Sequence, residues 1–329
     1  TNAGGAHTPE YGVTVNHTLG TTLVLPDGRI VRTGGVTEDS HGLDLTGCVV
    51  GSEGTFGLVT EVTVRLTRNP TTYRTMLGIF ETVDDATQTV SDIIAAGIVP
   101  GAMEMMDKLI LQAVEDAFHF GFPRDAEAVL IVELDGLEAG IDRLAARVVE
   151  ICKKNRARDV QFASTDEQRA AVWKSRKRAF GAIGRLSPSY CTQDGVVPRT
   201  KLPDILRFIR ATAAKYELTI ANVFHAGDGN IHPILLFDER DAEQTQRVLA
   251  ASNEILTECV RLGGSVTGEH GIGVEKLDHL ALMFSERDLA AQRRLREVFD
   301  PQRRANPYKI YATGAACVEV MRPMRRAAV

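Results

Sequence analysis

The sequence lacks the marks of a membrane protein and of a disulfide-stabilised secreted protein. No apolar stretch approaches the roughly 20 residues that span a bilayer, and no signal-peptide pattern stands at its start. Cysteine is sparse: its five positions are odd in number, and no two form a C-x-x-C pair. We therefore expect reduced thiols in a cytoplasmic protein. The cysteines are Cys48, Cys152, Cys191, Cys259 and Cys317.

The sequence also lacks an excess of one charge. Its formal net charge is −5 over 329 residues, without a long block of one sign. This argues against a nucleic-acid-binding surface, and the basic tail "RPMRRAAV" is short enough to be a solvated end. With 44% apolar and 25% charged residues, the chain has the composition of a globular protein of up to two domains. It begins inside a glycine-rich stretch, "TNAGGA", so we expect a fragment or a processed chain.

The residue pattern of the sequence changes near residue 70. Before this point, residues 19–33 predict two strands around a Pro-Asp-Gly turn. The other residues before this point predict strands and glycine-rich loops without a helix. After it, apolar strands alternate with amphipathic helices. We expect an α+β domain with a mostly antiparallel sheet and helices on one face. The expected helices cover about 84–97, 103–117, 139–155, 166–183, 202–216 and 241–262.

Two histidines flank a turn in "FHAGDGNIHP", residues 224–233. The flanking sequence predicts a hairpin, in which residues beside the connection face each other across the two strands. His225 and His232 could then reach one metal ion, since imidazole is a common metal ligand. From this spacing alone, a pair of satisfied or solvent-facing histidines remains the alternative.

A second stretch, "GGSVTGEHGIGVEK", places Glu269 and His270 between glycines. Two histidines and one carboxylate form the ligand set of an open catalytic site. His225, His232 and Glu269 are therefore the candidate ligands, and His270 is a candidate general base. The alternative is that Glu269 caps a helix that starts near Ile272.

These motifs, followed by "FDPQRRANPYKI", resemble the C-terminal half of the flavin-linked 2-hydroxyacid oxidoreductases of the vanillyl-alcohol oxidase type. That family includes D-lactate and D-2-hydroxyglutarate dehydrogenases. "KRAFGAIGRL" and "YCTQDGVVPRTKLPDIL" are most similar to the catalytic flavin subunit of bacterial glycolate oxidase. "TNAGG" and "GSEGTFGLVTEVTVRL" resemble the family's FAD-binding domain. The resemblance implies the second half of a PCMH-type FAD-binding domain at 1–70 and a ferredoxin-like α+β substrate domain at 71–329, with 300–313 returning to the flavin site.

The resemblance also implies roles for individual residues. His225, His232 and Glu269 match the metal ligands, for zinc, manganese or iron, and His270 matches the base that removes the substrate hydroxyl proton. Arg176 matches an arginine that clamps the substrate carboxylate, although it could also be a surface residue of a helix. The FAD-contacting positions are Asn2, Gly4, Gly5, Gly51, Ser52, Gly54, Thr55, Gly57, Val59 and Asn306.

The implied activity is oxidation of a small D-2-hydroxy acid, glycolate or D-lactate, to the 2-oxo acid with hydride transfer to FAD. Sister flavin-domain and iron–sulfur subunits, or another electron acceptor, would then reoxidise the flavin. The expected location is the cytoplasm, or the inner membrane's surface through partner subunits. A flavin-free metalloenzyme and a non-catalytic fragment are the alternatives.

Two departures from the family pattern carry expectations. The family's upstream glycine-rich loop for the pyrophosphate is not in this sequence, so we expect this chain to bind FAD weakly or not at all. Phe180 and Thr192 stand near the positions where some relatives hold a second carboxylate with threonine and lysine. This favours a small monocarboxylate substrate.

Overall fold

The computed structural model describes residues 1–37 and 42–311, which divide into two compact units. One unit contains Thr1–Gly4, Val13–Arg68 and the described chain from Val266 onward. The other contains Gly5–Gly12 and Asn69–Ser265. Residues 266–311 thus group with the early part of the chain and not with the helices and strands that precede them. Cys317, the basic tail and residues 312–313 lie outside the described residues.

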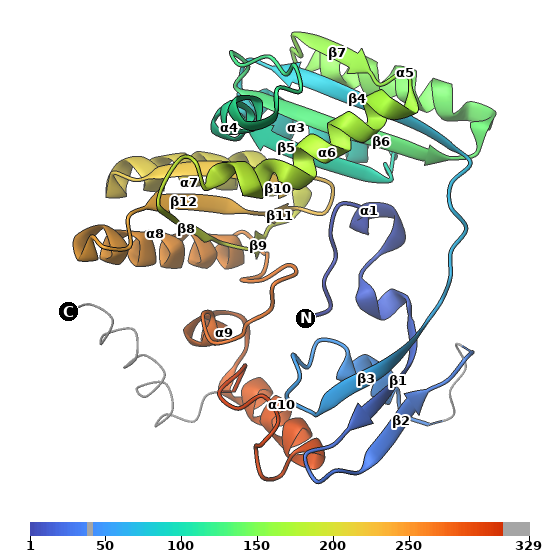
Figure 1. The fold of residues 1–329 in the computed structure, drawn as a ribbon, viewed down its shortest axis with the longest axis vertical. Coiled ribbons are helices and arrows are strands. Elements are labelled where there is room, and N and C mark those ends of the chain that lie inside the picture. Colours follow the sequence, from blue (N-terminus) through green and yellow to red (C-terminus); the bar gives the residue numbers. More distant parts are fainter. Residues whose placement is uncertain (38–41, 312–329) are drawn as a thin grey trace. The chain divides into compact units, whose positions relative to one another are not determined.

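The first unit contains the hairpin that the sequence predicts. In its described part, β1 (Thr18–Val24) lies between β2 (Ile30–Gly34) and β3 (Leu58–Val64), and both pairings are antiparallel (Figure 1). Gly28 closes the β1–β2 turn by donating its N–H to the carbonyl of Leu25 at 2.8 Å. The other elements of this unit are η1 (Thr14–Asn16), α2 (Leu45–Val49), η3 (Leu277–His279), α9 (Leu280–Met283) and α10 (Glu286–Phe299).

The expectation that residues 1–68 contain no helix was wrong in two places. Helix α1 covers Thr8–Tyr11, in the second unit, and α2 covers Leu45–Val49. Each is about one turn long, which is too short to produce an amphipathic period in the sequence. Local chemistry marks the second one, because the Asp44 side chain accepts the N–H of Gly47 at 2.8 Å and caps the turn.

The second unit is an α+β domain, as predicted. Among its described residues, nine strands form one sheet with the order β7-β4-β6-β5-β10-β11-β9, while β12 joins β10 to β8. Every pairing recorded in it is antiparallel. The strands are β4 (Thr72–Phe80), β5 (Ala102–Asp107), β6 (Ala128–Gly136), β7 (Asp159–Phe162), β8 (Ser189–Thr192), β9 (Gly195–Val196), β10 (Thr219–His225), β11 (Asn230–Ile231) and β12 (Pro233–Phe237).

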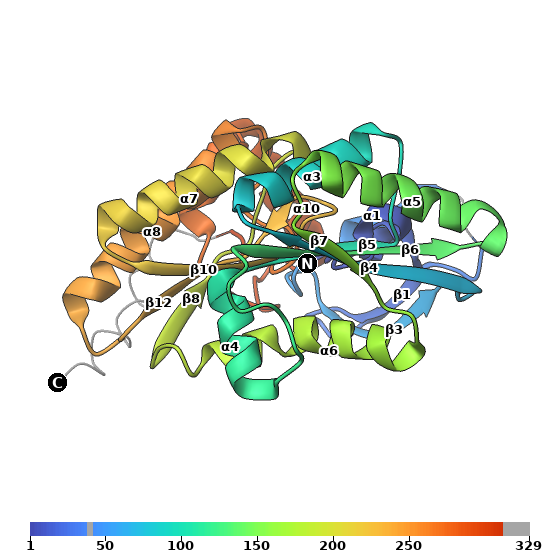
Figure 2. The ribbon, with the colours of Figure 1, turned by 90° about the horizontal axis from the view of Figure 1, so that it is seen from above.

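Helices cover both faces of this sheet, which corrects the expectation of one face. Figure 2 shows α3, α5, α7 and α8 on one side and α4 and α6 on the other. Each side has its own apolar core, and the segment "AVLIVEL" of β6 is buried throughout. A continuous apolar run of this kind is typical of a strand buried on both faces. The helices are α3 (Val83–Ala95), α4 (Lys108–Phe118), α5 (Glu138–Lys154), α6 (Asp166–Ile183), α7 (Leu202–Tyr216) and α8 (Ala242–Arg261), with η2 at Arg199–Lys201.

The expected helix at 103–117 is divided between a strand and a helix. Residues Ala102–Asp107 form β5, all six of them buried, and α4 begins at Lys108. "AMEMMD" consists largely of good helix formers, but pairing with β6 and β10 decides its conformation. Asp107 ends the strand and caps α4, because its side chain accepts the N–H of Ile110 at 3.1 Å. Burial raises the pKa of Asp107 to about 6, although several hydrogen bonds oppose the shift.

Within residues 1–37 and 42–311, none of the helices combines the length and the apolar character that a bilayer crossing requires.

Candidate functional site

His225 and His232 meet on one face of the second unit's sheet. The expected hairpin forms, but its register sets the two residues diagonally: His225 pairs with Asn230, and Asn222 pairs with Pro233. Diagonal residues on neighbouring strands share a face and remain within reach of large side chains. The two imidazole centroids lie 5.2 Å apart with the rings nearly perpendicular, and their ligand nitrogens lie within 4.8 Å of each other. The two rings can therefore approach one ion.

The turn between the histidines depends on Gly229, whose φ is +81°. A Cβ at this position would lie 2.1 Å from the carbonyl oxygen of Val197. The backbones are joined there, since the Val197 N–H donates to the Gly229 carbonyl at 3.1 Å. Both the conformation and the close approach require glycine. The turn between the histidines is thereby fixed to the segment that directly follows β9.

Glu104, on β5, lies directly opposite His225 in the strand register. Its two carboxylate oxygens have different partners: Oε1 lies 2.5 Å from His225 Nδ1, and Oε2 accepts from Arg176 Nε at 2.5 Å. The Glu104 side chain is fully buried. A buried carboxylate needs such partners to remain charged. Sequence analysis did not single out Glu104, which lies 121 positions from His225.

Arg176 reaches this carboxylate from α6. Its side chain is 8% exposed, so it is not a surface residue of the helix. Its Nη2 atom is buried and has no hydrogen-bond partner among the described residues. Phe180, one turn further along α6, has its ring 6.0 Å from the guanidinium carbon and 6.2 Å from the His232 ring. The guanidinium therefore offers an unused donor beside the two imidazoles.

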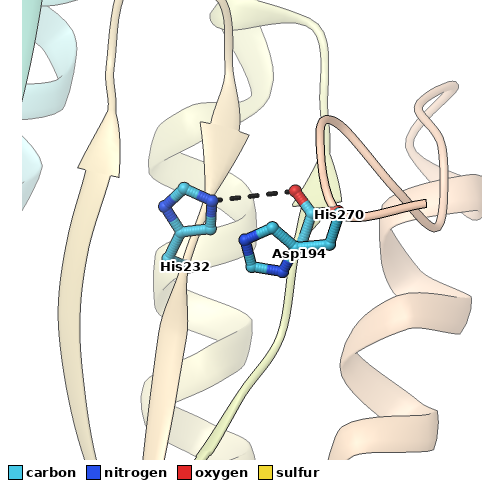
Figure 3. Close-up of side chains that lie close together, drawn as sticks. All are labelled: Asp194, His232 and His270. Carbon is cyan, nitrogen blue, oxygen red and sulfur yellow. Dashed lines mark ion pairs between the residues drawn. The ribbon is translucent and has the colours of Figure 1, made fainter. Parts of the chain in front are cut away.

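Asp194 is a second buried carboxylate of this face that sequence analysis missed. Strand β12 pairs Ile234 with Thr192, and β11 pairs Ile231 with Gly195, so the same register sets His232 against Asp194. The Asp194 Oδ1 and His232 Nε2 atoms lie 3.7 Å apart (Figure 3). Both side chains are almost fully buried. The sign of Asp194 in the sequence was a single acidic residue between the apolar ends of the segment "SYCTQDGVVP".

Another carboxylate on this face has a different set of partners. Glu133, on β6, is buried and accepts from Arg169 Nε and Nη2 at 2.7 Å each and from Trp173 Nε1 at 2.7 Å. Burial alone would raise the pKa of Glu133, but Arg169, Thr75 and Trp173 together lower it below its ordinary value. The side-chain partners of Glu133 are Thr75, Arg169 and Trp173, so Glu133 differs from Glu104, whose partners include a histidine.

Glu269 and His270 belong to the first unit. Their Oε1 and Nε2 atoms lie 3.8 Å apart, and the Glu269 side chain is 20% exposed. The expected alternative of a helix cap was wrong, because no helix starts near Ile272 and the next helical turn begins at Leu277. The loop is fixed instead by Glu53, whose carboxylate accepts the N–H groups of Ile272 at 2.7 Å and Gly273 at 2.8 Å. Sequence analysis had not singled out Glu53.

The glycine-rich loop at 51–57 is strongly curved. Its φ angles are positive at Gly51, Glu53, Gly54 and Gly57, which turns successive peptide groups in different directions. The Thr55 hydroxyl donates to the Ser52 carbonyl at 2.7 Å within the loop. Of the ten positions expected to contact FAD, nine lie in this unit and Gly5 lies in the other. The nine are Asn2, Gly4, Gly51, Ser52, Gly54, Thr55, Gly57, Val59 and Asn306.

Two of these positions join distant parts of this unit through their side chains. Asn306 donates its side-chain N–H to the Glu53 carbonyl, although the two lie 253 positions apart in sequence. Asn2 accepts the N–H of Val15 at 2.9 Å and so ties down the start of the chain. The early and late parts of the sequence thus form one compact structure around the loop.

The chain is similar to curated oxidoreductases along nearly its whole length. It is 43% identical to the glycolate oxidase subunit GlcD of Escherichia coli K12, over 97% of this chain and 64% of the relative. It is 30% identical to a D-lactate dehydrogenase of Anaerostipes hadrus, over 94% of this chain and 67% of that relative. The chain thus spans slightly less than two thirds of the length of the Escherichia coli relative.

The fold is similar to that of p-cresol methylhydroxylase with substrate bound, with a TM-score of 0.71 over 91% of this chain and 66% of that chain. The sequences are only 17% identical, so this likeness concerns the fold alone. The family model described as "FAD linked oxidases, C-terminal domain" matches residues 69–310. This stretch is more than half of the chain and contains the histidine hairpin, Arg176 and the Glu269 loop. The chain belongs to the FAD linked oxidase family, of which it contains the C-terminal domain.

Proposed function

We propose that this chain belongs to an FAD-dependent dehydrogenase that oxidises a small D-2-hydroxy acid, glycolate or D-lactate, to the 2-oxo acid. The observation that carries the proposal is the unused, buried Nη2 donor of Arg176 beside the His225–His232 pair. A guanidinium is a natural partner for a substrate carboxylate. The 43% identity to a glycolate oxidase subunit supports the choice of substrate.

The donor chemistry of the hairpin fits a divalent metal ion. Glu104 occupies Nδ1 of His225, which leaves Nε2 as the ligand atom, an arrangement typical of metal-binding histidines. His225, His232 and, from the sequence motif, Glu269 would hold zinc, manganese or iron. When bound, such an ion would polarise the substrate hydroxyl and carboxylate.

The first unit supplies a backbone that fits a flavin nucleotide. The curved loop at 51–57 contains three glycines with positive φ angles, Gly51, Gly54 and Gly57, and glycine lets a backbone approach a ligand such as a phosphate closely. The proposed FAD contacts are Asn2, Gly4, Gly5, Gly51, Ser52, Gly54, Thr55, Gly57, Val59 and Asn306. FAD, when bound, would accept the hydride from the substrate carbon.

The protein side chains would perform the remaining steps. Arg176 would hold the substrate carboxylate and so orient the carbon that carries the hydroxyl. His270, whose imidazole is 47% exposed, would accept the hydroxyl proton as general base. Phe180 places an apolar ring 6.2 Å from His232, which disfavours a second carboxylate on the substrate. A two- or three-carbon hydroxy acid suits this arrangement.

The partners follow from the reduced cofactor. A reduced flavin must pass its electrons on, so we propose an electron acceptor, either a sister flavin or iron–sulfur subunit or a separate carrier. The Escherichia coli relative is named a subunit of glycolate oxidase. We propose a cytoplasmic location, or a place at the inner membrane through such partners.

An absorption spectrum with metal analysis of the intact enzyme that contains this chain, supplied with FAD and zinc, tests this proposal. We expect a flavin spectrum that bleaches when glycolate or D-lactate is added without oxygen, and no bleaching with L-lactate. Metal-dependent activity in a colourless protein would contradict the flavin mechanism and favour a flavin-free metalloenzyme. Absence of cofactor, metal and turnover would instead indicate a non-catalytic role.

A further inference from the structure

We propose that Glu104 is a positioning residue that sets the proton on the His225 ring and the direction of the Arg176 guanidinium. The inference rests on the proposed function, because it concerns the site that the two residues would form. Glu104 itself would touch neither substrate nor metal. Its effect would pass through the two groups that do.

Glu104 determines which nitrogen of the His225 imidazole carries the proton. A neutral imidazole carries its proton on one nitrogen and a lone pair on the other. A carboxylate can only accept a hydrogen bond, so the contact from Glu104 Oε1 to His225 Nδ1 requires the proton to be on Nδ1. The lone pair is then on Nε2, the atom that faces away from Glu104. The ring is thereby prepared to bind a cation.

Glu104 also orients the arginine. Glu104 Oε2 accepts from Arg176 Nε, the inner nitrogen of the guanidinium. Because a guanidinium is planar, fixing Nε also fixes the direction of the outer nitrogens. Nη2 then remains without a partner among the described residues. One carboxylate thus orients both a proposed metal ligand and a proposed substrate clamp.

Burial and strand register make this arrangement rigid. The Glu104 side chain has no exposed surface, and β10 and β6 flank its strand on both sides. Glu133 provides a matched comparison, since it is a buried carboxylate of the same sheet with an arginine partner. Glu133 also accepts from Thr75 and Trp173, and changing it should therefore leave the His225 ring unaffected.

The decisive variant is Glu104→Gln. The Arg176 Nε–H requires the amide oxygen on its side, so the amide NH₂ must point toward His225 Nδ1. An NH₂ donor there moves the ring proton to Nε2, which removes the lone pair needed for a metal. We expect ¹⁵N NMR of histidine-labelled, metal-free chain, assigned with a His225→Gln variant, to show this exchange. Zinc affinity, measured with zinc alone, should fall 10- to 100-fold.

Three further variants separate positioning from packing. Glu104→Asp retains a carboxylate acceptor, so it should retain the Nδ1–H form of His225 and lose less zinc affinity than Glu104→Gln. This variant keeps the inference testable if Glu104→Gln fails to fold. Glu133→Gln should leave both readouts unchanged. In Glu104→Gln combined with Arg176→Met, no arginine N–H requires the amide oxygen, so the amide can turn its oxygen toward His225 Nδ1. Added zinc should then restore the Nδ1–H form of the His225 ring.

The inference is overturned if folded Glu104→Gln retains the Nδ1–H ring, or if Glu133→Gln causes the same changes. It is also overturned if the double variant binds zinc no better than Glu104→Gln. Failure of the proposed function gives a different result. If the wild-type chain binds no zinc, the proposed metal chemistry fails, while the ring proton in the metal-free chain still decides for or against Glu104.

Discussion

Replacing Gly229 with alanine should destabilise the second unit and disturb its histidine pair. The positive φ of +81° costs a residue with a Cβ about 1–2 kcal/mol. The new Cβ would also lie 2.1 Å from the Val197 carbonyl oxygen, so the two backbones must separate. Losing the hydrogen bond from Val197 to Gly229 adds about 1 kcal/mol. We therefore expect a loss of about 3 kcal/mol of unfolding free energy from strain and lost pairing together.

Two other glycines of the same unit separate these contributions. Gly97 has a φ of +74° with open space around its would-be Cβ, so Gly97→Ala should cost about 1–2 kcal/mol for the backbone conformation alone. Gly181 lies inside α6 with open space and an ordinary φ, so Gly181→Ala should stabilise by about 0.5–1 kcal/mol.

The assay is urea unfolding followed by tryptophan fluorescence. The sequence has a single tryptophan, Trp173, which lies in this unit and donates to Glu133, so its signal reports on this unit. Zinc binding and the ¹⁵N spectrum of the imidazoles should change in Gly229→Ala and not in the two controls. If Gly229→Ala loses no more stability than Gly97→Ala, the close approach to Val197 has no energetic role and our reasoning is refuted.

Three other predictions follow from the site and its surroundings. His270→Ala in an active form of the enzyme should lower kcat far more than it raises KM, and an unchanged kcat in steady-state assays would remove His270 from the chemistry. Arg176→Lys should mainly raise KM for glycolate, because the planar two-donor group is lost; a purely kcat effect would contradict a clamping role. Asp107 has a folded pKa of about 6 and an ordinary value of 3.8, so its contribution to stability is present below pH 3.8 and is lost as pH rises through 6. That loss is up to about 3 kcal/mol, and comparing unfolding free energies of wild type and Asp107→Asn between pH 4 and 7 should show it, whereas a constant difference would argue against the shift.

The sequence was sufficient for features that local patterns encode. The long helices, such as α6 and α8, have their own amphipathic period or capping residues, and they lie where they were predicted. The hairpin of His225 and His232 was marked by its turn residues. The class of the second unit followed from the alternation of strands and helices.

The sequence was insufficient to predict features that depend on pairing between strands distant in the chain. Residues 102–107 have a helical composition, yet neighbouring strands on both sides make them a strand. Glu104 and Asp194 are single acids in unremarkable segments, and only the register of the sheet brings each one opposite a histidine. The diagonal arrangement of the histidines also depends on register, which the turn sequence alone did not reveal.

The shared register of these groups has a consequence for folding. Glu104, His225, His232 and Asp194 come from neighbouring strands or the residues directly beside them, and they lie on the sheet face that bears the apolar core beneath α4 and α6. A slip of one residue in any of these strands would transfer its polar side chain to the opposite face. That face is filled by the apolar core beneath α3, α5, α7 and α8, where an unpaired charge is strongly disfavoured. The acids and imidazoles that form the site therefore destabilise any sheet in which these strands pair in a shifted register. The same residues thus support both the site and the correct pairing of the strands.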